Sequence, residues 1–159
     1  MQFIETERMI LSLASNEEME KLIEDSSDDV MRWVYSEMLE GAKLHPDKRE
    51  FYAVWLMLLK KEENRHIGDL SFKGITEDGI VEIGYGIKPG YEGNGYMTEA
   101  VSALVKWAFE RPEVSRVEAE AKESNIASIR VLTKAGFIPN GIRGEEGPRF
   151  VYKGNKLNN

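Results

Sequence analysis

Three strand-like segments follow one another in the middle of the sequence, with no helical segment between them. Residues 51–60 are rich in aromatic and branched side chains and are apolar on both faces, which predicts a buried strand. Residues 67–72 follow after a polar turn, and residues 81–87 form the third segment. A doubly wound parallel sheet requires a helix between successive strands. The order therefore argues against that architecture and favours a mixed, mostly antiparallel sheet.

Further strands and helices are predicted on either side of this central block. Apolar and branched residues predict strands over residues 9–13, 116–121, 138–143 and 149–153, the last two as a closing hairpin. Helical spacing and end signals predict helices over residues 17–24, 28–43, 96–111 and 125–135. The sequence therefore predicts an α+β fold whose mixed, mostly antiparallel sheet has six to seven strands and is flanked by about four helices. We expect a single domain over residues 1–159.

The composition is that of a folded chain without thiol chemistry. Hydrophobic residues make up 42% of the sequence, enough to form a core, and there is no cysteine to form a disulfide or to bind a metal. The two histidines have no carboxylate cluster beside them in the sequence, so we expect no metal site. The longest apolar run, residues 51–59, is far shorter than the roughly 20 residues that cross a bilayer. Residues 1–5 lack a basic and apolar leader, so we expect a cytoplasmic protein that does not bind membranes.

The formal charge of −7 is concentrated at the start of the chain. Residues 1–40 hold eleven acidic and three basic side chains, a net of −8, whereas the remaining residues nearly balance at +1. Nucleic-acid binding favours a basic surface, so we expect no nucleic-acid partner. The acidic segment is either a solvated helix face or a surface that attracts a cationic substrate.

A glycine-rich turn joins the third central strand to the long helix. Residues 90–100 read Gly-Tyr-Glu-Gly-Asn-Gly-Tyr-Met-Thr-Glu-Ala. Gly93 and Gly95 leave backbone N–H groups free to converge on one anion, and the helix N-terminus adds partial positive charge, so the turn suits a diphosphate. A dinucleotide fingerprint needs glycine where Thr98 stands, and a P-loop needs a lysine that is absent. An isolated Gly-x-Gly is also compatible with a plain tight turn.

The run from Glu82 through Ala100 resembles the acetyl-CoA-binding motif of the Gcn5-related N-acetyltransferases (GNAT). Residues 7–11 resemble the opening strand of that family. Residues 123–128 and 134–137 resemble its second conserved block. The resemblance covers nearly the whole chain and is strongest to the branch of ribosomal-protein alanine acetyltransferases. It implies the GNAT fold, acetyl-CoA as cosubstrate and no metal.

The resemblance also implies which residues bind the cosubstrate. The backbone of residues 92–97 would hold the diphosphate, residues 85–87 would pair with the pantetheine arm like an added strand, and the side chains of Asn125 and Ser128 would lie near the thioester. Family members carry arginine or glutamine at the positions of Gly90 or Glu92, so we expect the Glu92 side chain to point away from the ligand. The implied binding residues are Tyr85, Gly86, Ile87, Glu92, Gly93, Asn94, Gly95, Tyr96, Met97, Asn125 and Ser128.

Glu82 and Ser128 are the candidate catalytic residues. Glu82 resembles the glutamate that serves as general base in the histone-acetylating branch of the family. The alternative for Glu82 is an ion pair with a neighbouring cation or solvation of a sheet edge. Many family members protonate the leaving thiolate with a tyrosine, but the matching position here is Leu132. Three alternatives stay open: Ser128 takes that role, water takes it, or the thiolate leaves unassisted. His66 is expected at the start of a strand without a catalytic role.

The function implied is transfer of an acetyl group from acetyl-CoA to a primary amine. The acidic first quarter favours a cationic small molecule or a peptide amine as acceptor. Two alternatives stay open: a non-catalytic protein that binds or senses CoA, and a protein Nα-acetyltransferase. A homodimer is compatible with the sequence.

Overall fold

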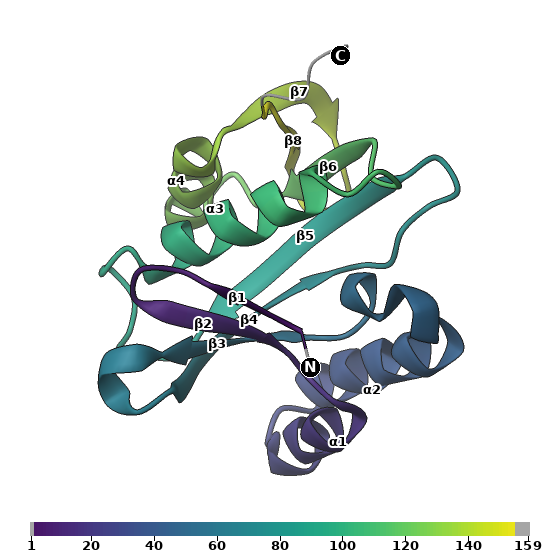
Figure 1. Ribbon diagram of the computed structural model, residues 1–159. Helices are drawn as coiled ribbons and strands as arrows, with labels where there is room; N and C mark the ends of the chain where they lie inside the picture. The colour runs from purple at the N-terminus through teal and green to yellow at the C-terminus, as the bar shows by residue number, and fades with distance from the viewer. Residues whose placement is uncertain (1, 155–159) are drawn as a thin grey trace.

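The computed structural model describes residues 2–154, which form one eight-stranded sheet with helices on both faces (Figure 1). The strands are β1 (Phe3–Glu5), β2 (Met9–Leu13), β3 (Trp55–Leu59), β4 (Arg65–Phe72), β5 (Ile80–Ile87), β6 (Arg116–Glu120), β7 (Phe137–Arg143) and β8 (Pro148–Tyr152). The helices are α1 (Asn16–Asp25), α2 (Asp29–Leu44), α3 (Tyr96–Phe109) and α4 (Ile126–Ala135), with 3-10 turns η1 (Pro46–Phe51) and η2 (Lys60–Glu62). The strand order is β1-β2-β3-β4-β5-β6-β8-β7, and only β5 and β6 run parallel.

The predicted fold class is confirmed, and the described residues contain one strand more than the upper expectation. The additional strand is β1, whose three residues pair with β2, so that Phe3 lies opposite Ser12. Phe3 is 57% exposed and only Ile4 packs against the core, so the strand is too short to give a recognisable sequence pattern.

The predicted strand over residues 51–60 begins only at Trp55. The N–H groups of Tyr52 and Ala53 both donate to the carbonyl of Arg49, which keeps the preceding residues in a helical turn. The Trp55 indole N–H donates to the carbonyl of Glu50 at 2.9 Å and fixes the end of this turn against the strand. Apolar character alone could not separate these two backbone conformations.

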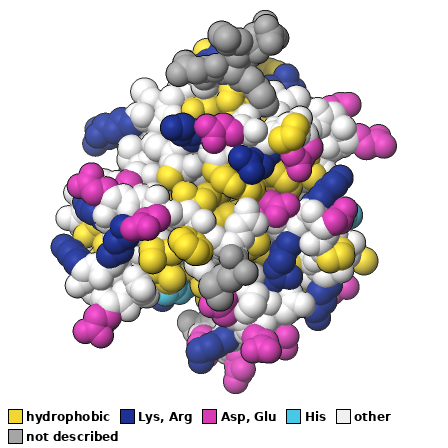
Figure 2. Space-filling model, viewed as in Figure 1, with side chains coloured by type: hydrophobic (Ala, Val, Ile, Leu, Met, Phe, Trp, Pro, Cys, Tyr) yellow, Lys and Arg dark blue, Asp and Glu magenta, His cyan; other side chains and the backbone are white. Residues whose placement is uncertain are grey.

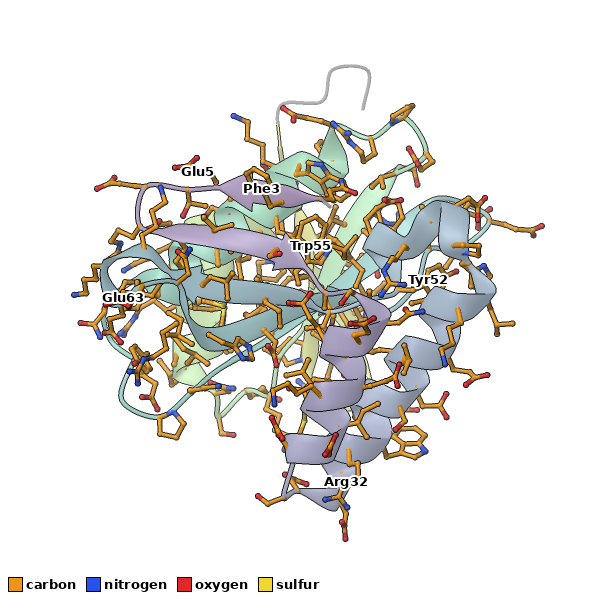
Figure 3. All side chains as sticks on the ribbon, turned by 60° about the horizontal axis from the view of Figure 1, so that its bottom comes forward. Phe3, Glu5, Arg32, Tyr52, Trp55 and Glu63 are labelled. Atoms are coloured by element: carbon orange, nitrogen blue, oxygen red, sulfur yellow. The ribbon has the colours of Figure 1, made fainter. Side chains whose placement is uncertain are left out.

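β3 lies between two apolar cores, as its two-sided apolar pattern predicts. Trp55, Met57 and Leu59 are fully buried on the face that α3 covers. Leu56 belongs to the second core, on the face that α1 and α2 cover. Figure 3 shows Trp55 near the middle of the molecule and Arg32 near the far tip of the α1–α2 pair. The sheet therefore separates one face that bears α3 and α4 from another that bears α1 and α2.

The acidic first quarter of the chain forms α1 and α2. Ser15 begins α1 with a capping box, because its hydroxyl accepts from the Glu18 N–H while the Glu18 carboxylate accepts from the Ser15 N–H. Acidic side chains gather at the bottom of the view in Figure 2, where Figure 1 places α1. Within residues 2–154, no helix has both the length and the apolar character needed to cross a membrane.

The central β5 strand separates from β6 partway along its length. The two strands pair in parallel only over residues 80–82, with Glu82 opposite Glu118. β5 nevertheless stays paired with β4 as far as Ile87, which lies opposite Gly68. From Gly84 to Ile87, the β5 edge that faces β6 therefore has no strand partner among the described residues.

Arg149 of β8 holds the closed end of this separation. Its guanidinium lies 3.1 Å from the Glu82 carboxylate on β5, and 2.9 and 2.5 Å from those of Glu118 and Glu120 on β6. Burial raises the pKa of Glu82, but hydrogen bonds from Lys73 and Arg149 outweigh it and hold that pKa below its usual value. One arginine thus joins three strands at the point where two of them begin to part.

We predict that Arg149→Met lowers the free energy of unfolding near pH 7 by about 1–3 kcal/mol, because three carboxylates lose their shared cation. The depressed pKa of Glu82 contributes stability above the unfolded value of roughly 4.3, and this contribution is lost as the pH falls through the folded pKa. Wild-type stability should therefore fall more steeply than that of the variant between about pH 5 and pH 3. Urea unfolding at several pH values measures both effects. Arg143→Met, which removes a largely exposed ion pair with Glu123, is the control and should change little.

Candidate functional site

Two clefts meet at the free end of β5. The first has a volume of about 410 Å³ and lies between β5, the glycine turn and the start of α4. The second, of about 770 Å³, lies between β4, β5 and the α1–α2 pair. Residues 85–87 line both clefts. A ligand held along this segment in the first cleft is therefore next to whatever the second cleft contains.

The glycine turn has a backbone that only glycine adopts easily. Gly90, Gly93 and Gly95 have φ angles of 94°, 76° and 80°, in the left-handed region. A Cβ atom at Gly93 would meet nothing within 4 Å, so the space beside this residue is open. The Tyr96 to Thr98 segment that follows begins α3 and also lines the first cleft.

The N-terminus of α3 differs from those of the other described α-helices. Ser15, Asp28 and Asn125 cap α1, α2 and α4 with side-chain oxygens. Gly95, which precedes α3, provides no such cap, so the amides of the first turn are available to an external anion. Arg130 and Lys134 of α4 add positive charge to the same cleft. These features fit a diphosphate, as the sequence predicts.

Arg8 holds the glycine turn in place. Its Nη1 donates to the carbonyl of Asn94 at 2.9 Å, and its Nε pairs with Glu99 at 2.7 Å. The guanidinium also lies over the Tyr96 ring, 4.4 Å from the centroid. The Glu99 carboxylate accepts a further hydrogen bond from Thr6. Sequence reasoning assigned Arg8 only to an opening strand, because a contact with the turn 86 residues away leaves no local pattern.

The Glu92 carboxylate is bound to the backbone of the turn, and the expectation that it points away from the ligand stays a prediction. The residue lines the first cleft, and its carboxylate accepts a hydrogen bond from the Gly90 N–H at 2.8 Å. Backbone N–H groups of Glu92 itself and of Gly90 hold the pKa of this carboxyl below its usual value. The carboxylate is therefore a fixed negative charge beside the proposed diphosphate position.

Tyr85 and Ser128 meet across the first cleft. The Tyr85 hydroxyl lies 2.8 Å from Ser128 Oγ, which connects β5 to α4. Burial raises the pKa of Tyr85, so its phenol stays protonated at neutral pH. The Asn125 side chain caps α4 by accepting from the Ser128 N–H at 3.1 Å. The structure thus brings these three predicted residues together, with Asn125 acting through the position of the helix.

Glu82 lies outside the residues that line the two clefts. Its carboxylate is 2.9 Å from Lys73 Nζ and 3.1 Å from Arg149. This geometry supports the ion-pair alternative, and the role of Glu82 as a base stays an untested prediction. Leu132, at the position of the family's tyrosine, is fully buried.

The second cleft contains a cluster that sequence reasoning missed. The Tyr35 hydroxyl of α2 donates to Asp69 Oδ2, and His66 Nε2 lies 2.5 Å from Asp69 Oδ1. Residues three apart on a regular strand point to opposite faces. Here a bulge leaves Ile67 without a partner, since Leu58 pairs with His66 and Met57 with Gly68, so both side chains meet on one face. No signal in the local sequence marks this bulge.

Asp25, Asp28, Lys73 and Lys88 complete the charged lining of the second cleft. Among the described residues, no group of three or more His, Cys, Asp or Glu side chains is arranged to hold a metal ion. A glycine turn with an uncapped helix start, an unpaired strand edge and a second cleft beyond that edge therefore meet at one place in the molecule. This combination fits the class that the family resemblance implies, the acyl-CoA-dependent acyltransferases.

The comparisons with known proteins agree with this class. The acetyltransferase (GNAT) domain family model matches residues 6–138, so the chain belongs to the GNAT acetyltransferase family. The chain is 33% identical over 99 residues to YjdG, an uncharacterized N-acetyltransferase of Bacillus subtilis. That alignment covers 62% of this chain and 58% of YjdG. The chain is 39% identical over 82 residues to YjcK of the same organism, covering 50% and 45%. The chain thus spans about half the length of these relatives.

Solved structures share the fold over nearly the whole chain. A ribosomal L7/L12 α-N-protein acetyltransferase in complex with coenzyme A aligns with a TM-score of 0.73 at 20% identity, covering 95% of this chain and 96% of that chain. The aminoglycoside acetyltransferase AAC(6′)-Ib, in complex with paromomycin and acetyl-CoA, aligns with a TM-score of 0.65 at 22% identity. That alignment covers 90% of this chain and 92% of the other.

We predict that Gly93→Asp abolishes acetyl-CoA binding while the fold is retained. The substitution places a carboxylate in the open space beside the turn, where it repels a diphosphate, and it strains a left-handed residue. Calorimetric titration with acetyl-CoA measures binding, and circular dichroism measures the fold. Gly141→Asp, at φ 83° and outside the clefts, is the matched control for backbone strain. Equal affinity in the Gly93 variant and the wild type would mean that the ligand binds elsewhere.

We predict that Glu92→Gln, in contrast to Gly93→Asp, strengthens the binding of CoA. The amide oxygen can still accept from the Gly90 N–H, so the turn keeps its shape while one negative charge disappears. The Kd for CoA should fall by roughly two- to fivefold at low salt, with a smaller effect at high salt because the site is exposed to solvent. An unchanged or weaker affinity would show that this carboxylate does not oppose the phosphates.

Proposed function

We propose that the protein transfers an acetyl group from acetyl-CoA to a primary amine bound in the second cleft. The observation that supports this most directly is the shared lining of the two clefts at residues 85–87. The first cleft suits the cosubstrate, and the second opens toward an acidic helix pair. The cosubstrate supplies an activated acyl group as a thioester.

Each part of the first cleft has a separate task in this proposal. The uncapped start of α3 and the backbone of residues 92–97 bind the diphosphate. The unpaired edge of β5 hydrogen-bonds the pantetheine arm, in the way that a peptide adds to a sheet edge. A free N–H on the same edge stabilises the negative charge that develops on the carbonyl oxygen. The linked hydroxyls of Tyr85 and Ser128 stand near the sulfur.

The charge of the second cleft supports a cationic acceptor. Asp25 and Asp28 lie where α1 gives way to α2, and Asp69 lies on the sheet. Two proteins that share the fold are a ribosomal-protein α-N-acetyltransferase and an aminoglycoside acetyltransferase, and both kinds of acceptor present primary amines. Near pH 7.4 only roughly one lysine-type amine in a thousand is neutral, so such an acceptor binds as a cation and then has to lose a proton.

We predict that thiol release from acetyl-CoA is faster with polyamines and aminoglycosides than with amines of similar size that carry no further cationic group. The double variant Asp25→Asn, Asp28→Asn should raise KM for cationic acceptors by roughly three- to tenfold at low salt, because two of the attracting charges are lost. Asparagine is also a good N-cap, so α2 should stay intact. Calorimetry should show an unchanged Kd for acetyl-CoA.

Glu17→Gln with Glu20→Gln, on the exposed surface of α1 outside the cleft, is the control for net charge. Equal rates for acceptors with and without further cationic groups would contradict the proposal that the acidic side chains select the acceptor by its charge. Tight CoA binding without turnover on a broad acceptor panel would instead support a CoA-sensing protein. Activity restricted to peptides with a free N-terminus would indicate a protein Nα-acetyltransferase.

A further inference from the structure

The His66–Asp69 pair lines the second cleft but has no role in the function proposed above. Asp69 lies opposite Gly86 in the β4–β5 pairing, and Gly86 lines both clefts. The bulge at Ile67 brings His66 onto the same face as Asp69. The pair therefore stands beside the segment where the two clefts meet, on the side proposed for the acceptor.

We propose that His66, oriented by Asp69, takes the proton that the acceptor amine loses during acyl transfer; this inference rests on the proposed function of the second cleft. Histidine is the side chain best suited to this work near neutral pH. The His66 and Asp69 side chains are both 23% exposed, so they are held by the protein and still reachable by a substrate.

The hydrogen bonds of Asp69 fix which nitrogen of His66 can act. Tyr35 donates to one carboxylate oxygen, and its raised pKa, caused mainly by burial and by the nearby Asp69 charge, keeps the phenol protonated. The other oxygen faces Nε2 at 2.5 Å, so in the neutral imidazole Nε2 bears the proton and donates it to this contact. Nδ1 then presents a lone pair, and within residues 2–154 it has no hydrogen-bond partner.

The proton balance of the step is simple. The acceptor first gives up its ammonium proton to water, so that the reacting nitrogen is neutral. This nitrogen then bonds to the acetyl carbon, and the carbon–sulfur bond breaks with the electron pair leaving on sulfur. The extra proton on nitrogen passes to His66 Nδ1, and Asp69 stabilises the imidazolium that results. Water then removes that proton and protonates the thiolate, so no further reagent is needed.

Glu82, the glutamate that the family resemblance suggested, is less suited to this step. Lys73 and Arg149 both bind its carboxylate and hold its pKa below the usual value, which makes it a weaker proton acceptor. It also lies outside the residues that line the second cleft. The other titratable residues that line that cleft are Asp25, Asp28, Tyr35, Lys73, Tyr85 and Lys88, and the Tyr85 hydroxyl is turned away from it toward Ser128.

The pH dependence of kcat/KM tests the assignment. Both the acceptor amine and the base must be unprotonated, so log kcat/KM should rise with slope two at low pH and slope one between the two pKa values. His66→Gln should lower kcat/KM by roughly a hundredfold and leave only the slope of one that belongs to the amine. Glu82→Gln should keep both the slope of two and the slope of one in the pH profile. His45→Gln is the matched control, because His45 stacks on Tyr52 at 4.2 Å and does not line the cleft.

Proton NMR gives a second measurement that does not depend on turnover. The chain has only two histidines, so loss of one imidazole signal in His66→Gln assigns both. The titration of His66 in the wild type should coincide with the lower limb of the rate profile. Adding a cationic acceptor should shift the His66 signals and leave those of His45 unchanged.

Asp69→Asn separates a positioning role from a merely structural one. The variant should bind acetyl-CoA with unchanged Kd, which also verifies its fold. Its kcat should fall, and the low-pH limb of its kcat/KM profile should shift along the pH axis. Persistence of a slope of two in a folded His66→Gln protein would overturn this inference alone. Absence of turnover in the wild type on every amine would overturn the proposed function and the inference with it.

Discussion

The parting of β5 from β6 after Glu82 is the constraint on which the rest of the site depends. A parallel pair that continued to Ile87 would satisfy the backbone of residues 84–87 inside the sheet and leave no edge for a ligand. Arg149 keeps the closed end together by bridging carboxylates on both strands. The unpaired polar groups beyond it are the surface that the proposed function assigns to the pantetheine arm.

The proposed anion site at the end of β5 depends on glycines without side chains and on a helix N-terminus without a side-chain cap. Gly93 and Gly95 permit left-handed residues beside open space, and Gly95 leaves the first turn of α3 uncapped. Such a turn has little intrinsic rigidity, so its shape comes from outside, where Arg8 binds the Asn94 carbonyl and Glu99 together. The opening strands of the chain thus shape the proposed cosubstrate site although they do not line its cleft.

The sequence predicts those parts of the protein that depend on local pattern. The helices, the two-sided β3 strand and the glycine turn all follow from spacing, capping or backbone freedom within a few residues. The Tyr35–Asp69 hydrogen bond, the contacts of Arg8 and the Arg149 cluster join residues far apart in the chain, and no local pattern encodes them. The same limit explains why the sequence could not name the cation that pairs with Glu82, since Arg149 is 67 positions away.

The alternation of β5 explains how one strand can serve two clefts. Tyr85 points toward α4, where its hydroxyl meets Ser128. Its neighbours Gly84 and Gly86 therefore face the opposite side, over the floor of the second cleft. A Cβ atom at Gly86 would meet nothing within 4 Å, so a larger residue would project into the open space of the second cleft. Glycines weaken a strand, and in the proposed function this cost keeps the floor low enough for an amine to approach the thioester beside Asp69 and His66.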